Sequence, residues 1–143
     1  MHPPIDLESK PMVVIVADDD DDYRALVVAA LQADGHATLE AHDGQELLAL
    51  LEQANDGEPS LRPDVLITDV KMPKLSGLGV LEALRGAHWR LPVVVMTVLS
   101  DDSIHTVAMR LGAIGVLRKP FDTDDMLTAL RNARTVTARH GAW

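Results

Sequence analysis

Five side chains that can take part in chemistry each follow or end a short apolar run of the sequence; they are Asp18, Asp19, Asp69, Thr97 and Lys119. A carboxylate can attack phosphorus as a nucleophile, and an ammonium can offset the charge of a phosphoryl group. Carboxylates ~5 Å apart repel by roughly 3 kcal/mol per pair at an effective dielectric of ~20, so three of them need a cation. Mg²⁺ prefers oxygen ligands and is typically held by carboxylates, waters and a phosphate. If these side chains meet, the sequence predicts phosphoryl transfer with Mg²⁺.

Short strands must carry these side chains to one place. The predicted strands cover residues 12–17, 36–40, 64–68, 91–97 and 115–118, and a helical pattern separates each from the next. The central runs do not alternate between apolar and polar residues, as expected when helices cover both faces of a parallel sheet. The predicted fold class is therefore α/β, with a doubly wound parallel sheet.

Apolar residues at helical spacing give the predicted helices a core-facing stripe. The stripes are Leu47, Leu51 and Ala54, then Ile104, Val107, Ala108 and Leu111, then Met126, Leu130 and Ala133. Residues 55–63 are rich in turn formers and predict an exposed loop. We expect one domain over residues 12–134, with short tails at 1–11 and 135–143.

Ligands of open parallel sheets bind beyond the carboxyl ends of the strands. The five side chains all stand at such positions, so we expect them to converge. A solvated acidic run is the alternative for residues 18–22, and we favour it for Asp20, Asp21 and Asp22, which suit the first turn of a helix. Asp69 as a helix N-cap, Thr97 as an ordinary strand residue and Lys119 as a surface lysine are the corresponding alternatives. The six histidines have no metal-ligand spacing, and we assign them no role.

The ordered set of motifs resembles the response regulator receiver family. The set comprises Asp18-Asp19, Asp69 with Met72-Pro73 and Gly77 after it, Thr97, and Lys119-Pro120-Phe121. The resemblance covers roughly residues 12–134. It implies a flavodoxin-like fold, with five parallel strands in the order 2-1-3-4-5 and five helices. It also implies a cytoplasmic signalling domain that takes a phosphoryl group from a histidine kinase or a histidine phosphotransfer domain and has no external turnover.

The resemblance implies a role for each site residue. Asp69 would be the phosphoacceptor, and Mg²⁺ would bind Asp19, Asp69 and the backbone carbonyl of Lys71 directly, and Asp18 through water. Lys119 would pair with the phosphoryl group, and Thr97 would hydrogen-bond to it. The Lys119-Pro120 peptide bond would be cis, which costs only ~0.5 to 1 kcal/mol before proline.

Composition excludes several other classes. A formal charge of −9 disfavours direct binding to nucleic acid or to an anionic membrane. There is no cysteine, so a thiolate metal site and a disulfide framework are impossible. No apolar run reaches the ~20 residues of a membrane span, and the first residues lack the apolar stretch of a signal peptide. We therefore expect a cytoplasmic protein.

Two positions depart from the family pattern. The family commonly has an aromatic residue three positions before the lysine, where this sequence has Val116, and a small residue after the hydroxyl, where it has Val98. We hypothesise that Asp69 is phosphorylated while the output surface responds weakly or by another route. A downstream protein partner or output domain is expected, and dimerisation through the face containing Val116 is left open.

The residues favour phosphoacceptance over three other functions. The main alternative is an interaction module that keeps the receiver fold but signals without phosphorylation. A measurement of metal affinity would discriminate between this module and a phosphoacceptor. A phosphohydrolase is disfavoured because Lys71 stands where that chemistry often uses a second aspartate as acid and base. A nucleotide enzyme is disfavoured because neither glycine-rich phosphate motif occurs.

Overall fold

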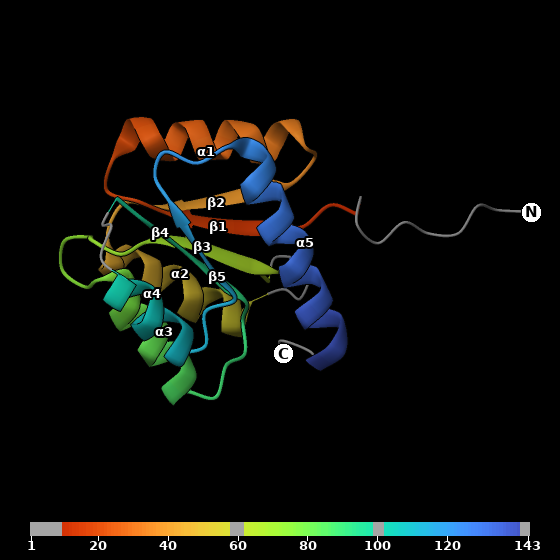
Figure 1. Ribbon diagram of the computed structural model, residues 1–143. Coiled ribbons are helices and arrows are strands. Elements are labelled where there is room, and N and C mark those ends of the chain that lie inside the picture. The colour runs from red at the N-terminus through yellow and green to blue at the C-terminus, as the bar shows by residue number, and fades with distance from the viewer. Residues whose placement is uncertain (1–9, 58–61, 99–101, 141–143) are drawn as a thin grey trace, which may run out of the picture.

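A computed structural model describes residues 10–57, 62–98 and 102–140 of the chain. Five strands alternate with five helices (Figure 1). The strands are β1 (Val13–Ala17), β2 (Ala37–Ala41), β3 (Val65–Asp69), β4 (Val93–Thr97) and β5 (Gly115–Arg118). The helices are α1 (Asp21–Ala33), α2 (Gly44–Asp56), α3 (Gly77–Gly86), α4 (Asp102–Arg110) and α5 (Thr123–His140).

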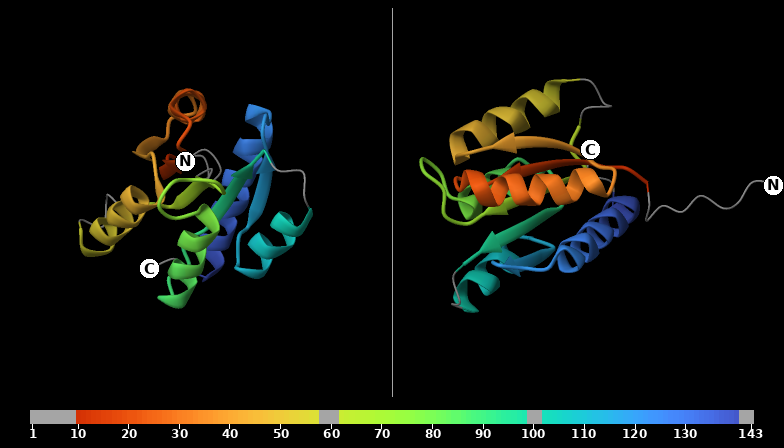
Figure 2. Two further views of the ribbon diagram at one scale, coloured as in Figure 1. Left: turned by 90° about the vertical axis from the view of Figure 1, so that its left-hand side faces the viewer. Right: turned by 90° about the horizontal axis from the view of Figure 1, so that it is seen from above.

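The strands form one parallel sheet in the order β2-β1-β3-β4-β5. This confirms the predicted fold class and strand order. β2 lies on one side of β1, and β3, β4 and β5 follow on the other side, so the strand order reverses between β1 and β3. Ligands of such sheets bind beyond the carboxyl ends of the strands at that point. The helices lie on both faces, with α1 and α5 over one face and α2, α3 and α4 over the other (Figures 1 and 2).

Alternate residues of the central strands build two cores, because successive side chains point to opposite faces of a sheet. Ile15 of β1 belongs to the core under α2, α3 and α4, and its neighbours Val14 and Val16 belong to the core under α1 and α5. β3 and β4 are buried along their whole length. The unbroken aliphatic runs of the sequence are therefore explained by helices on both sides.

Three expected boundaries were wrong by two residues or more. The last helix continues to His140, so residues 135–140 are not a tail; no glycine or proline interrupts α5, and the Thr135 hydroxyl donates to the Arg131 carbonyl at 3.1 Å. Residues 55 and 56 belong to α2 and not to a loop, since its helical hydrogen bonding continues to Asp56. β4 starts at Val93, two residues later than expected, because the preceding Pro92 has no N–H to donate. Residues 1–9, 58–61 and 141–143 lie outside the described residues.

The predicted stripe of α4 is narrower than expected. Ala108 is fully buried, and Ile104 and Leu111 pack against the core, but Val107 is 41% exposed. The stripes of α2 and α5 are buried as predicted. Among the described residues, no helix has the length and apolar character of a membrane span.

Candidate functional site

The carboxyl ends of β1 and β3 bring three carboxylates together. Asp18 and Asp19 directly follow β1, and Asp69 is the last residue of β3. Each of the three offers a carboxylate oxygen within 4.8 Å of the others. Asp18 is fully buried and Asp69 is 9% exposed, whereas Asp19 is exposed. The cluster therefore opens to solvent on the side of Asp19.

Lys119 supplies one positive charge to this cluster from beyond the end of β5. Its Nζ lies 2.6 Å from Oδ2 of Asp18 and 3.4 Å from Oδ2 of Asp69. Burial lowers the pKa of the ammonium, but the two carboxylates outweigh burial and raise it overall. Lys119 therefore stays protonated and bridges the two buried acids.

One ammonium cannot neutralise two buried carboxylates, and Asp69 shows the consequence. Burial raises its pKa from 3.8 to about 6; the charge of Lys119 opposes the rise, and the charge of Asp18 adds to it. One oxygen of Asp69 accepts a hydrogen bond from the Val70 N–H at 2.9 Å, while Oδ2 faces Lys119. The carboxylate is therefore held with one oxygen toward the ammonium.

The donor set fits a hard divalent cation. Three carboxylates and one ammonium leave about two negative charges in excess when all groups are ionised. Oxygen ligands and this charge suit Mg²⁺. Lys71 follows in the loop after β3 with an exposed side chain, and the role of its backbone carbonyl stays a prediction.

The loop between β3 and α3 folds back against Asp69. The N–H of Gly77 donates to the Val70 carbonyl at 2.9 Å, and a Cβ at Gly77 would overlap the Asp69 carbonyl oxygen. Only glycine fits this approach. The N-cap of α3 is Ser76, which accepts from the Gly79 N–H, so Asp69 is not a helix cap.

Thr97 ends β4 and is 2% exposed. Its carbonyl accepts from the Lys119 N–H at 2.8 Å, which ties the ends of β4 and β5 together. The Lys119-Pro120 peptide bond is cis, as predicted. The role of the Thr97 hydroxyl stays a prediction. The two departures also differ in burial, because Val98 is 68% exposed and Val116 is partly buried against the core.

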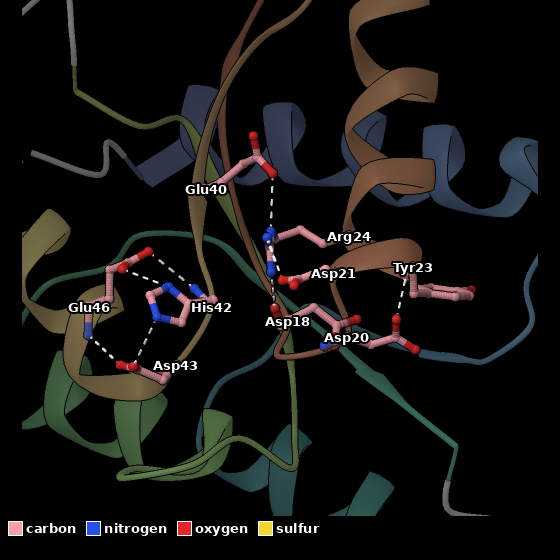
Figure 3. Close-up of polar contacts among 9 residues, drawn as sticks. All are labelled: Asp18, Asp20, Asp21, Tyr23, Arg24, Glu40, His42, Asp43 and Glu46. Atoms are coloured by element: carbon pink, nitrogen blue, oxygen red, sulfur yellow. Dashed lines mark hydrogen bonds and ion pairs between the residues drawn. The ribbon is translucent and has the colours of Figure 1, made fainter.

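Arg24 is a site neighbour that the sequence analysis missed. Its guanidinium donates to the Asp18 carbonyl at 2.7 Å and to Glu40 at 3.0 Å, and it pairs with Asp21 at 2.8 Å (Figure 3). Burial lowers the pKa of Arg24, but the hydrogen bonds and charges of Asp21 and Glu40 raise it overall. Arg24 thereby fixes the backbone that presents Asp18. A lone arginine after an acidic run gives no sequence signal of this role.

The predicted solvated acids lie where expected. Asp20 is the N-cap of α1, accepting from the Tyr23 N–H at 3.1 Å (Figure 3). Asp21 and Asp22 are exposed in the first turn of the helix. Tyr23 was also missed: its ring lies beside Lys119.

A second polar group lies at the start of α2, beside the loop that follows β3. His42 lies 2.7 Å from Glu46 and 3.5 Å from Asp43 (Figure 3). Lys74 lies 3.4 Å from Asp43. Asp43 caps α2, and the backbone N–H of Glu46 is the main cause that lowers its pKa. This group is a capping arrangement at the start of α2.

The sequence pattern of the response regulator receiver domain matches residues 14–131, which is most of the chain. The chain belongs to this family. Among similar receivers of known structure is a receiver domain protein from Clostridium thermocellum, with a TM-score of 0.80, 30% identity, and coverage of 90% of this chain and 98% of that one. The chemotaxis response regulator CheY4 of Vibrio cholerae has a TM-score of 0.73 and 29% identity, covering 87% and 99% of the two chains.

Curated relatives of this receiver are response regulators. The DNA-binding transcriptional regulator NtrC of Salmonella typhimurium is 36% identical over 110 residues, which are 77% of this chain and 22% of that protein. Response regulator MprA of Mycobacterium tuberculosis is 37% identical over 102 residues, which are 71% of this chain and 41% of that protein. The chain thus spans well under half the length of these relatives. It is a receiver domain of two-component signal transduction.

Proposed function

We propose that Asp69 is the phosphoacceptor of this receiver and takes its phosphoryl group from a phosphohistidine of a histidine kinase or a histidine phosphotransfer domain. The observation that carries the proposal is the cluster of three carboxylates within 4.8 Å, with Lys119 bridging Asp18 and Asp69. A surface acidic patch has no reason to hold a buried lysine. Phosphoryl transfer needs both signs of charge at one point.

The transfer is a displacement at phosphorus. An oxygen of the ionised Asp69 forms the new O–P bond, the N–P bond of the phosphohistidine breaks, and the departing imidazole keeps the bonding electron pair. Lys119 offsets the negative charge of the phosphoryl oxygens, and the Thr97 hydroxyl donates a hydrogen bond to one of them once it is attached. The pKa of about 6 leaves most Asp69 ionised at neutral pH, so the nucleophile is available.

Asp19, Asp69 and the Lys71 carbonyl would hold Mg²⁺ directly, and Asp18 would hold it through water. When bound, the ion supplies positive charge to the transferring phosphoryl group. The assignment rests on the fit of the oxygen donors and their excess charge. The chain's own turnover is limited to its phosphorylation and dephosphorylation, and the downstream step is contact with a protein partner or an output domain.

Intact mass after incubation with Mg²⁺ and phosphoramidate tests this proposal. We expect the wild type to gain one phosphoryl group, and Asp69→Asn to gain none. Asp22→Asn is the matched control, because Asp22 is an exposed first-turn acid of α1 outside the cluster. A wild type that gains no mass, or an Asp69→Asn protein that gains as much as the wild type, contradicts the proposal.

The receiver-shaped interaction module is not favoured. The departures from the family pattern at Val98 and Val116 favour this module, but the carboxylate cluster and Lys119 are intact. The two functions predict different metal binding, since only the phosphoacceptor needs an Mg²⁺ site that depends on Asp19. Titration of wild type and Asp19→Asn with Mg²⁺ therefore separates them.

A further inference from the structure

The ammonium of Lys119 lies over the face of an aromatic ring. Its Nζ is 4.4 Å from the centroid of the Tyr23 ring. The same ammonium lies 2.6 Å from Oδ2 of Asp18 and 3.4 Å from Oδ2 of Asp69, and the lysine side chain is 8% exposed. The ring is therefore one wall of the place where the ammonium sits.

Two elements hold this ring in position. The Tyr23 N–H donates to Oδ1 of Asp20 at 3.1 Å, which fixes the residue in the first turn of α1. The ring meets Phe121 edge to face, with centroids 5.7 Å apart and an interplanar angle of 80°. Phe121 is two residues beyond Lys119, so the ring is fixed relative to the backbone that carries the lysine.

Lysine needs such a wall because its charge is at the end of a flexible four-carbon stem. A cation over a ring face is attracted by the ring quadrupole, most strongly where water is excluded. Without the ring, the ammonium could stay with Asp18 or turn toward solvent. A phosphoryl group on Asp69 requires the ammonium on the Asp69 side, 3.4 Å from Oδ2 in this structure.

We propose that Tyr23 is a positioning residue, whose ring face holds the Lys119 ammonium where it can meet the phosphoryl group on Asp69. This inference rests on the proposed phosphoacceptor function. The ring and not the hydroxyl acts, because Nζ contacts the ring face. Tyr23 is not one of the motif residues that carry the resemblance to the family.

Phosphorylation rates with phosphoramidate and saturating Mg²⁺ test the inference. We expect Tyr23→Leu to slow phosphorylation about three- to thirty-fold, the range that loss of a desolvated cation–π contact implies. Tyr23→Phe keeps the ring face and is expected to stay within about twofold of the wild type. Mg²⁺ affinity should be unchanged in both variants, because both keep the three carboxylates that would hold the ion.

A packing control separates positioning from loss of fold. Leu26 lies on α1 in the same hollow as Tyr23 and Phe121, is 67% exposed, and is not one of the charged residues of the cluster. We expect Leu26→Ala to be phosphorylated at the wild-type rate. The ε-methylene protons of Lys119 provide a direct readout: ring shielding should be present in the wild type and in Tyr23→Phe, and absent in Tyr23→Leu.

A double-mutant cycle with Lys119→Met decides whether Tyr23 acts through the lysine. Tyr23→Leu should not slow the residual phosphorylation of Lys119→Met any further. Where the wild type is phosphorylated, three outcomes overturn the inference alone: a wild-type rate in Tyr23→Leu, an equally slow Tyr23→Phe, or a full effect of Tyr23→Leu without Lys119. A wild type that takes no phosphoryl group shows instead that the proposed function has failed, and the inference fails with it.

Discussion

Polar side chains at the two ends of the sheet have different kinds of partner. At the amino ends, His36 accepts from the Met12 N–H at 3.0 Å, and Asp64 accepts from the Val13 N–H at 2.8 Å. At the carboxyl ends, the carboxylates of Asp18, Asp19 and Asp69 meet one another and the ammonium of Lys119. At the first end His36 and Asp64 each accept from a backbone N–H, whereas the second end keeps excess negative charge.

Arg85 shows the same contrast at the amino end. It donates to the carbonyls of Trp89, Leu91 and Gly112 at 2.7 to 3.0 Å, and so joins the segments that precede β4 and β5. Burial lowers the pKa of its guanidinium. The amino end of the sheet thus has polar side chains that stabilise the fold through backbone contacts. The carboxyl end holds carboxylates whose mutual repulsion is relieved by positive charge.

Removal of the Arg85 clamp should have the largest effect on stability. Arg85→Met leaves three carbonyls without their donor, and we expect the free energy of unfolding to fall by about 2 to 4 kcal/mol. Arg90→Met is the control, since Arg90 is exposed in the segment between α3 and β4, with an expected change within about 0.5 kcal/mol. Urea denaturation measures both. A loss below about 1 kcal/mol for Arg85→Met would mean that water replaces the clamp.

Asp69→Asn should raise the free energy of unfolding at neutral pH, whereas Arg85→Met lowers it. Folding raises the pKa of Asp69 from 3.8 to about 6, so between these pH values the carboxyl is ionised in the unfolded chain but still protonated in the folded protein. The free energy of unfolding therefore falls as pH rises from about 4 to about 6. Above that window the wild type should be less stable than Asp69→Asn by about 1 to 3 kcal/mol, and near pH 4 the two should agree. Urea denaturation in a chelator at both pH values measures the difference. Equal stability at pH 8 would show that Lys119 fully compensates the acids.

Mg²⁺ should offset part of the repulsion among the carboxylates of Asp18, Asp19 and Asp69. At about ten times its dissociation constant, a ligand of the folded state adds about 1.4 kcal/mol to the free energy of unfolding. We expect that gain for the wild type and for Asp22→Asn, and a much smaller gain for Asp19→Asn. Thermal or urea denaturation with and without Mg²⁺ measures it. An equal gain in Asp19→Asn would place the ion elsewhere.

The sequence predicts most of this division and misses particular contacts. Aliphatic runs without alternation located the strands to within two residues, and the rule for parallel sheets placed Asp18, Asp69 and Lys119 at one edge. Tyr23 and Arg24 were missed because their roles depend on how α1 is rotated against the sheet, which spacing alone does not give. The length of α5 was underestimated because its polar last turns lack the apolar stripe that marked the helix.

The smallest expected effect is the response of the face formed by α4 and β5. Val116 has no ring to reorient, its β-branched side chain is stiff, and it packs partly buried against the core. A switch needs an element with two arrangements, and Val116 does not supply one. We expect phosphorylation to shift amide resonances next to Asp69 strongly and those of α4 and β5 only weakly. Two-dimensional amide NMR with excess phosphodonor measures both regions in one sample.

Val116→Tyr sharpens this prediction, because it restores the aromatic residue common in the family. We expect its amide shifts in α4 and β5 on phosphorylation to exceed those of the wild type, while the shift at Val70 stays similar. The Val70 amide, which donates to Asp69, reports phosphorylation in each sample. Large phosphorylation-dependent shifts across α4 and β5 in the wild type would contradict the hypothesis of a weak output response. They would also show that the charged end of the sheet signals to this face without an aromatic switch.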